Sequence, residues 1–491
     1  MPMSPAPVVS AESGWFSWRR PSSPGNTEAY DAVEEIPFHR TKQDSLSTFS
    51  IDVDTASYAN VRRMLSSGDR VPPGAVRLEE MVNYFTYDYP PPDGPHPFSV
   101  NTAVASCPWA AGHKLVRIGL HGREIAKANR PDANLVFLID VSGSMGDPAK
   151  LPLVQSSLRM LVNELQPRDR IAIAVYAGAS GLVLPSTTCS DKQRILSAIN
   201  KLESGGSTNG GEGIELAYAT AKQHFISGGI NRVVLATDGD FNVGVTDESS
   251  LVKLIQQKAK TGIYLSVLGF GMGNYKDSTL EKLADKGNGN YAYIDTLNEA
   301  RKVLVKQAGA SLITIAKDVK IQVEFNPLHV AGYRLLGYEN RKLEHQDFSD
   351  DTKDAGEIGA GHTVTALYEI IPAGQPVPSV KDIPLKYTST ATPTAAAASG
   401  ELLTVKLRYK KPGASNSQLL QHVVMDSNQS FDAADSDFRF ATAVTAFGMK
   451  LRGSPYAKAI STRQIRSWAS NSVGKDADGY RREFVKLAGK L

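Results

Sequence analysis

Cysteine and long apolar segments are both scarce in this sequence of 491 residues. The two cysteines, Cys107 and Cys189, lie in separate segments and match no metal-binding spacing, so we interpret them as isolated thiols. So few cysteines neither require nor exclude an oxidising compartment. No apolar run approaches the roughly 20 residues that cross a bilayer, so we expect no transmembrane segment.

The sequence also lacks an excess of one charge. Its 54 Lys and Arg residues nearly balance 51 Asp and Glu residues, and no basic block stands out. Because a nucleic-acid-binding surface depends on such a block, we expect no nucleic-acid partner. Hydrophobic residues make up 41% of the chain, which is typical of a soluble globular protein. At this length we expect about two to four domains.

The N-terminal stretch is rich in Pro and Ser and contains no apolar core of a signal peptide. We interpret residues 1–40 as a disordered leader. If the native protein is exported, its signal lies upstream of this chain or has been left out of it.

Residues 131–311 alternate short apolar runs with helical periodicity. The runs NLVFLID, RIAIAVYAG and NRVVLATDG are interleaved with amphipathic segments such as LPLVQSSLRMLVNEL. Unbroken Val, Ile and Leu strands between helices indicate a mostly parallel sheet covered on both faces. The pattern therefore predicts a doubly wound α/β domain.

The regions on either side, 41–130 and 312–425, are strand-rich. In DVKIQVEFN the apolar residues alternate with polar ones, which is typical of a half-buried antiparallel strand. One face carries Val319, Ile321, Val323 and Phe325, and the other carries Lys320, Gln322 and Glu324. We expect the α/β domain to be inserted in, or flanked by, β-rich sandwich-like regions, and separate β modules stay open as an alternative.

The last segment, 426–491, is predicted to be helical. Phe440, Val444, Phe447 and Leu451 recur on one helical face, and Ser436 is placed as a cap for that helix.

Oxygen-bearing side chains follow three turns of the α/β segment. Asp140, Ser142 and Ser144 come directly after a buried strand, Thr208 lies in the loop GGSTNGG, and Asp238 ends another strand. Ligands of a doubly wound sheet bind at the carboxyl ends of its strands, where these turns are expected. Hard oxygen ligands without a nearby His or Cys suit Mg²⁺, Mn²⁺ or Ca²⁺ and are poor for Zn²⁺ or copper.

This pattern resembles the von Willebrand factor type A (VWA) domain, whose metal-ion-dependent adhesion site (MIDAS) reads D-x-S-x-S, then a Thr, then an Asp. All five positions are filled in order, by Asp140, Ser142, Ser144, Thr208 and Asp238. The resemblance implies that the hydroxyls contact the metal directly and the aspartates act partly through water. Octahedral coordination then leaves a position that an Asp or Glu of a partner protein would fill. The implied function is non-enzymatic, metal-dependent protein–protein binding of the adhesion type.

The flanking stretches STFSIDVDTASYANVRRML and NPLHVAGYRLLGYENR resemble a family of bacterial VWA proteins that are often exported lipoproteins. That resemblance favours the cell envelope as the location. An intracellular adaptor for a chaperone-type ATPase is an alternative that would use the same metal site. A signal peptide encoded upstream of Met1 would eliminate it.

A second Ile-Asp-Val turn lies in the N-terminal region, as IDVDTASY. Asp52-Val-Asp54-Thr55 resembles the D-x-D nucleophile turn of haloacid-dehalogenase phosphatases. In that family a Thr or Val stands two places after the second Asp, where this chain has Ala56. The chain also has no convincing Lys and acidic pair downstream. We therefore interpret Asp52, Asp54 and Ser57 as capping or hydrogen-bonding groups and not as a second metal or catalytic site.

Overall fold

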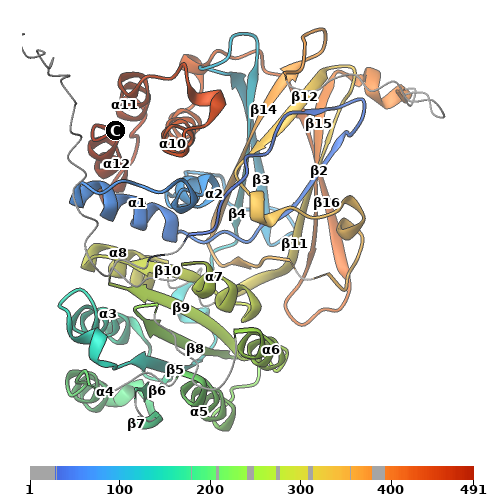
Figure 1. The fold of residues 1–491 in the computed structure, drawn as a ribbon. Coiled ribbons are helices and arrows are strands. Elements are labelled where there is room, and N and C mark those ends of the chain that lie inside the picture. Colours follow the sequence, from blue (N-terminus) through green and yellow to red (C-terminus); the bar gives the residue numbers. More distant parts are fainter. Residues whose placement is uncertain are drawn as a thin grey trace, which may run out of the picture.

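A computed structural model describes residues 28, 30–177, 180–205, 210–239, 248–271, 277–307, 313–353, 355–378 and 393–491. In this part of the chain, an α/β domain lies beneath a β-sandwich and a group of helices (Figure 1). Residues 1–27 and 29 of the expected leader lie outside the described residues. Ile36 and Phe38 are buried, and β1 (His39–Arg40) pairs with β12 (Val330–Leu336).

The α/β domain is built on one six-stranded sheet. Its strands lie in the order β10 (Tyr291–Ile294), β9 (Tyr264–Phe270), β8 (Ile230–Thr237), β5 (Ala133–Asp140), β6 (Arg170–Tyr176) and β7 (Ser180–Thr188). All neighbours are parallel except β7, which runs antiparallel to β6 at the edge. The predicted doubly wound, mostly parallel sheet is confirmed.

Helices cover both faces of this sheet, as the side chains of β5 require. Leu135 and Phe137 join a core with α3 (Leu151–Glu164), α4 (Lys192–Asn200) and α8 (Leu297–Arg301). Val136 and Leu138 face the other way, toward α5 (Gly210–Gln223), α6 (Glu248–Ala259) and α7 (Asp277–Lys286). Because successive side chains of a strand point to opposite faces, an unbroken apolar run fits this central strand.

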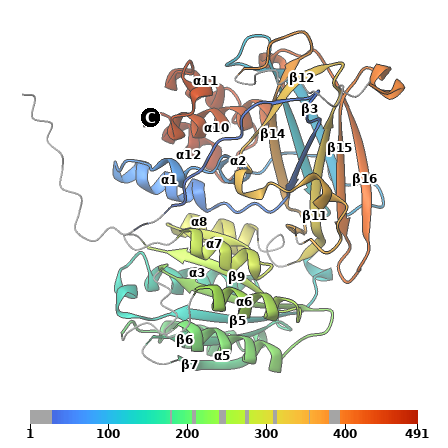
Figure 2. The same ribbon diagram turned by 45° about the vertical axis from the view of Figure 1, so that its right-hand side comes forward.

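Two antiparallel sheets form the sandwich seen at the right of Figure 2. One has the order β1, β12, β14 (Thr363–Pro372), β4 (Lys114–Gly122), β3 (Phe98–Ser106). The other has the order β13 (Ile358–Gly359), β11 (Thr314–Phe325), β15 (Glu401–Lys410), β16 (Ser417–Met425), with β2 (Leu46–Ser50) also paired to β11. Strands from both sides of the α/β domain pair directly, as β4 with β14 and β2 with β11. The α/β domain is thus inserted into the sandwich, and the alternative of separate β modules is wrong.

Strand β11 is more deeply buried than its alternation predicts. Its apolar face is buried as expected, but on the polar face Lys320 is 1% exposed and Gln322 is 7% exposed. The Lys320 ammonium donates to the Asp350 backbone carbonyl, and the Gln322 amide donates to Thr48. A polar segment therefore covers the second face, which the period-two pattern of one strand does not reveal.

The remaining helices gather beside the sandwich. These are α1 (Ala56–Ser67), α2 (Leu78–Asn83), α10 (Ser436–Arg452), α11 (Thr462–Ser470) and α12 (Tyr480–Ala488), which share one apolar core. The cap of α10 is Asp435 and not Ser436, because the Asp435 carboxylate accepts the Phe438 N–H at 2.6 Å. In the described part of the chain, no helix is long and apolar enough to cross a membrane.

Short helical turns connect these elements: η1 (Pro73–Ala75), η2 (Lys127–Asn129), η3 (Gly143–Gly146), η4 (Cys189–Asp191), η5 (Lys302–Lys306), η6 (Glu339–Arg341), η7 (His345–Phe348), η8 (Ala395–Ser399), η9 (Phe431–Ala433) and η10 (Pro455–Ala457).

Candidate metal centre and its surroundings

The first turn of the predicted metal site lies where β5 ends. Asp140 is fully buried, and one of its carboxylate oxygens accepts the Ser142 backbone N–H at 2.9 Å. The other accepts hydroxyls from Tyr176 at 3.1 Å and Thr237 at 3.3 Å. Burial raises the pKa of Asp140, and the bonds from Ser142 oppose that rise. These partners are neutral, so they fix the carboxylate without cancelling its charge.

The two serines of this turn lie close together, one buried and one exposed. The Ser142 and Ser144 hydroxyl oxygens are 3.1 Å apart, and Ser144 is exposed whereas Ser142 is buried. The turn bends into η3 before α3 begins, which brings both hydroxyls to the carboxyl end of the sheet. Two hydroxyl oxygens at this separation can both contact one small cation.

Asp238 follows β8, the strand next to β5, and is 2% exposed. Its Oδ2 accepts a hydrogen bond from the Lys150 ammonium at 2.7 Å, and the Lys150 side chain is itself only 12% exposed. Lys150 is the residue just before α3. A cation of the protein therefore lies against one of the predicted metal-binding carboxylates.

The structure thus brings four of the five predicted residues to the same edge of the sheet. The fifth, Thr208, lies outside the described residues. The donors present fit a hard divalent cation: two carboxylates and two hydroxyls, all oxygen. Within the described ranges, no group of three or more His, Cys, Asp or Glu side chains gathers to hold a metal ion, so a metal here depends on hydroxyl ligands.

Sequence reasoning missed Lys150 and the two hydroxyls that orient Asp140. Lys150 lies in the stretch GDPAKLP, ten residues after Asp140, where nothing in its spacing sets it apart from an ordinary surface lysine. Tyr176 and Thr237 each end a neighbouring strand. Their positions beside Asp140 could be found only from the strand order.

The second Ile-Asp-Val turn has a different environment, at the junction of the α/β domain and the N-terminal flank. Asp54 is buried, and it accepts the backbone N–H of Tyr291 in β10 at 2.8 Å. Arg341 lies 3.2 Å from Asp52 and 3.4 Å from Asp54. The same guanidinium contacts Glu281 at 2.9 Å and Asp285 at 2.5 Å.

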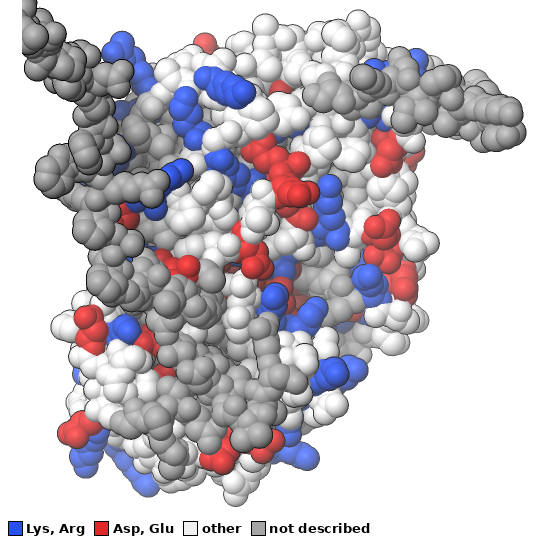
Figure 3. Space-filling model, in the orientation of Figure 1, with Lys and Arg blue, Asp and Glu red and all other residues white. Residues whose placement is uncertain are grey.

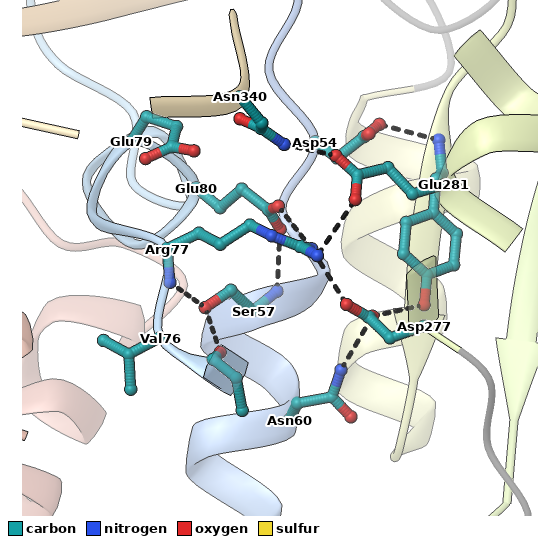
Figure 4. A network of polar contacts seen from close by, with 12 residues as sticks. Asp54, Ser57, Asn60, Val76, Arg77, Glu79, Glu80, Asp277, Glu281 and Asn340 are labelled. Carbon is teal, nitrogen blue, oxygen red and sulfur yellow. Dashed lines mark hydrogen bonds and ion pairs between the residues drawn. The ribbon is translucent and has the colours of Figure 1, made fainter. Parts of the chain in front are cut away.

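A second arginine extends this cluster (Figure 4). Arg77 contacts Glu80 at 3.1 Å, Asp277 at 2.8 Å and Glu281 at 3.0 Å. The Ser57 hydroxyl donates to the Ala75 carbonyl and accepts the Arg77 backbone N–H. We call this group the junction cluster: Arg77 and Arg341 with Asp52, Asp54, Glu80, Asp277, Glu281 and Asp285.

The junction cluster holds six carboxyl groups for two guanidinium groups. Burial raises the pKa of Asp52 and of Glu281 to about 8, and that of Asp277 to about 6. Asp52 and Asp54 connect two parts of the chain through their contacts with Arg341 and, for Asp54, with the Tyr291 N–H. As expected, they act as hydrogen-bonding groups, but their partners lie far away in the sequence. Neither residue caps α1, because the N-cap residue of that helix is Thr55, whose side chain makes no capping bond.

Three family models match the chain. The model described as "von Willebrand factor type A domain" matches residues 134–307, one described as "von Willebrand factor" matches 24–117, and one described as "Uncharacterized protein YfbK, C-terminal" matches 310–491. Uncharacterized protein YfbK of Escherichia coli (strain K12) is 45% identical over 473 residues, covering 95% of this chain and 81% of that protein. The chain belongs to the YfbK family. Its inserted α/β unit is a VWA domain.

Two further matches cover a smaller part of the chain or are less similar to it. The human inter-alpha-trypsin inhibitor heavy chain H4 is 27% identical over 159 residues, which are 31% of this chain and 17% of that protein. A solved structure titled "von Willebrand factor type A from Catenulispora acidiphila" is 15% identical, covers 92% of this chain and 91% of its own, and has a TM-score of 0.39.

Proposed function

We propose that this YfbK-family chain binds a protein partner through a divalent cation held by its VWA domain. VWA domains commonly mediate protein–protein interaction, and many bind such a metal at the MIDAS. The residues that would hold it are Asp140, Ser142, Ser144, Thr208 and Asp238, and Mg²⁺ is the first choice, with Mn²⁺ or Ca²⁺ as alternatives. When bound, the cation supplies a Lewis-acidic position for an Asp or Glu side chain of the partner.

The observation that carries this proposal is the pair of hydroxyl oxygens 3.1 Å apart beside two buried carboxylates. Neutral hydroxyls contribute no charge, so two carboxylates neutralise a divalent cation only once Asp238 is released from Lys150. The exposed Ser144 places the site where a partner can reach it. Protein recognition through the metal therefore suits this donor set better than a closed structural metal site does.

A phosphatase function for Asp52 and Asp54 has no support from the geometry. Asp54 is buried and bonded to the Tyr291 N–H, and Arg341 contacts both carboxyl groups. Burial raises the pKa of Asp52 to about 8, so this carboxyl group carries a proton at neutral pH and is a poor nucleophile. We propose that the chain acts by binding and not by catalysis.

Calorimetric titration of the full chain with Mg²⁺ and Mn²⁺ tests the metal. We expect saturable binding that Ser142→Ala and Asp238→Ala abolish. Ser227→Ala is the matched control, because Ser227 is exposed in the turn before β8, at the opposite end of the sheet. Metal binding that is equal in all four proteins would overturn the proposal.

Partner binding is tested by retention of proteins from lysate and envelope fractions in Mg²⁺ and in EDTA. A partner held in Mg²⁺ and lost in EDTA, in Ser142→Ala and in Asp238→Ala supports the adhesion-type function. Equal retention under both conditions would rule out a metal-bridged interface.

A further inference from the structure

A second candidate binding site lies at the other end of the VWA sheet, between that sheet and the sandwich. It is a cavity of about 290 Å³. The residues that line it come from the start of β8, the segment before β10, the end of β2 and the segments around β11 and β13, and include Arg232, Asp285, Lys286, Asn290, Lys342 and Glu357. Figure 3 shows the hollow between the two halves of the molecule, with Lys and Arg side chains at its rim.

Arg232 is the unusual group of this cavity. It is 2% exposed, and its guanidinium donates to the Ser266 hydroxyl at 2.6 Å and lies 5.8 Å from the centre of the Tyr264 ring. Its Nε is buried and has no hydrogen-bond partner. Among the residues that the structure describes, no carboxylate lies within ion-pair distance of this guanidinium. Burial lowers the pKa of Arg232, and the charge of Glu357 opposes that effect from beyond ion-pair distance.

An unpaired buried guanidinium is costly, because it loses hydration without gaining an opposite charge. The molecule carries several arginines that are nearly as buried, but the others described above, such as Arg77 and Arg341, each contact at least three carboxylates. Arg232 differs in that it lines a cavity and has no such carboxylate partner among the described residues. The missing partner is therefore expected to come from outside the chain.

The rim of the cavity is positively charged, as Arg232 is. Lys286 and Lys342 are exposed, and within the described ranges neither has a carboxylate at ion-pair distance. The acidic residues that share the cavity are already engaged: Asp52 and Asp285 contact Arg341, and Glu357 accepts the Thr314 hydroxyl at 2.9 Å. The unbalanced charges of the cavity are thus positive.

We propose that this cavity binds the oxyanion group, carboxylate or phosphate, of a small molecule, with Arg232 as its principal partner and Lys286 and Lys342 at the entrance. A guanidinium presents a planar fork of N–H donors that matches both groups. The volume admits a small metabolite and excludes a folded partner. The site is separate from the MIDAS, which lies at the carboxyl end of the same sheet.

Binding of inorganic phosphate and of succinate to the full chain is the test, measured by calorimetry and by the rise in melting temperature. EDTA and constant ionic strength, set with sodium chloride, keep the MIDAS metal and general screening out of the result. Saturation by phosphate alone assigns phosphate esters, saturation by succinate alone assigns carboxylates, and saturation by both assigns a general oxyanion site. Neither anion binding above the chloride control would overturn the proposal.

Variants locate the site. Arg232→Met, which keeps a long apolar side chain, is expected to abolish binding, and Arg232→Lys, which keeps the charge but not the fork, to weaken it about tenfold. Arg168→Met is the control, because Arg168 is 45% exposed and paired with Asp132 on the surface. If Arg232→Met does not fold, Arg232→Lys and Lys342→Met decide, with unchanged affinity in both contradicting the proposal. Loss of metal binding at the MIDAS would leave this result untouched.

Discussion

The two Ile-Asp-Val turns of this chain share three residues and little else. Asp140 is held by N–H and O–H donors that carry no charge, so its negative charge stays available to a cation. Asp52 lies against the Arg341 guanidinium and beside other carboxyl groups, so its charge is either paired or removed by a proton. The comparison teaches that a turn sequence sets where a carboxylate lies, and distant residues set what it can bind.

The largest effect is expected when the junction cluster loses a cation. Arg341→Met leaves Asp52, Asp54 and Asp285 without their guanidinium, whereas Glu281 keeps Arg77, and breaking a buried ion pair in this way costs about 3–5 kcal/mol. Differential scanning calorimetry should show a clear fall in melting temperature. Arg168→Met, on an exposed pair, should cost no more than about 1 kcal/mol. Equal melting temperatures for the two variants would show that the cluster is not a structural junction.

A matched pair of serine substitutions should separate the roles of the two turns. Ser57→Ala leaves the Ala75 carbonyl and the Arg77 N–H without their partner, at a cost of about 1–3 kcal/mol, without changing Mg²⁺ affinity. Ser142→Ala should cost about 0.5–1.5 kcal/mol, the contribution of an ordinary hydrogen bond, and abolish Mg²⁺ binding. Thermal melts and metal titrations of both proteins check this, and the comparison fails if the two variants lose the same property.

The pH dependence of stability should distinguish Asp52 from an ordinary aspartate. Its pKa is raised from 3.8 to about 8 in the folded state, so the folded chain holds a proton that the unfolded chain has released between these values. By linkage, stability falls as pH rises through this range. Relative to Asp52→Asn, the wild type should lose on the order of 1–2 kcal/mol, a value reduced by the 20% exposure of the side chain. Parallel pH profiles of the two melting temperatures would contradict the assignment.

The smallest expected effect concerns the cation at the metal-site turn. Lys150→Met removes the ammonium that bonds Asp238, so Mg²⁺ should bind about tenfold more tightly, and less so at high salt. Lys260→Met, an exposed lysine between α6 and β9, serves as the control. Unchanged or weaker Mg²⁺ affinity in the Lys150 variant would mean that Lys150 does not compete with the metal.

Features written in consecutive residues could be predicted from the sequence. The alternation of apolar runs and amphipathic helices predicted the parallel sheet, because burial of both faces imposes that composition. The D-x-S-x-S turn predicted the neighbourhood of Asp140, Ser142 and Ser144, because the turn is local and the strand before it sets its place. The position of Asp238 followed from the same rule for strand ends.

Features that depend on residues far apart in the sequence could not be predicted. Arg341 reaches Asp52 across the whole inserted domain, and Lys150 reaches Asp238 from another turn. The burial of Lys320 depends on a segment that covers β11, and not on the strand itself. Even the choice of Asp435 over Ser436 as a helix cap depends on where the first helical turn begins, a difference of one residue.

The insertion of the VWA domain also sets an order of events during synthesis. When the ribosome has completed β2 and β4, their partners β11 and β14 have not yet been made, and the entire VWA domain emerges in between. The strands of that domain pair with one another, so its sheet can form as soon as the domain has been made. During that time β2 and β4 still lack their partners β11 and β14. The nascent chain consequently keeps strand edges open to edge-to-edge association until β11 and β14 have been made.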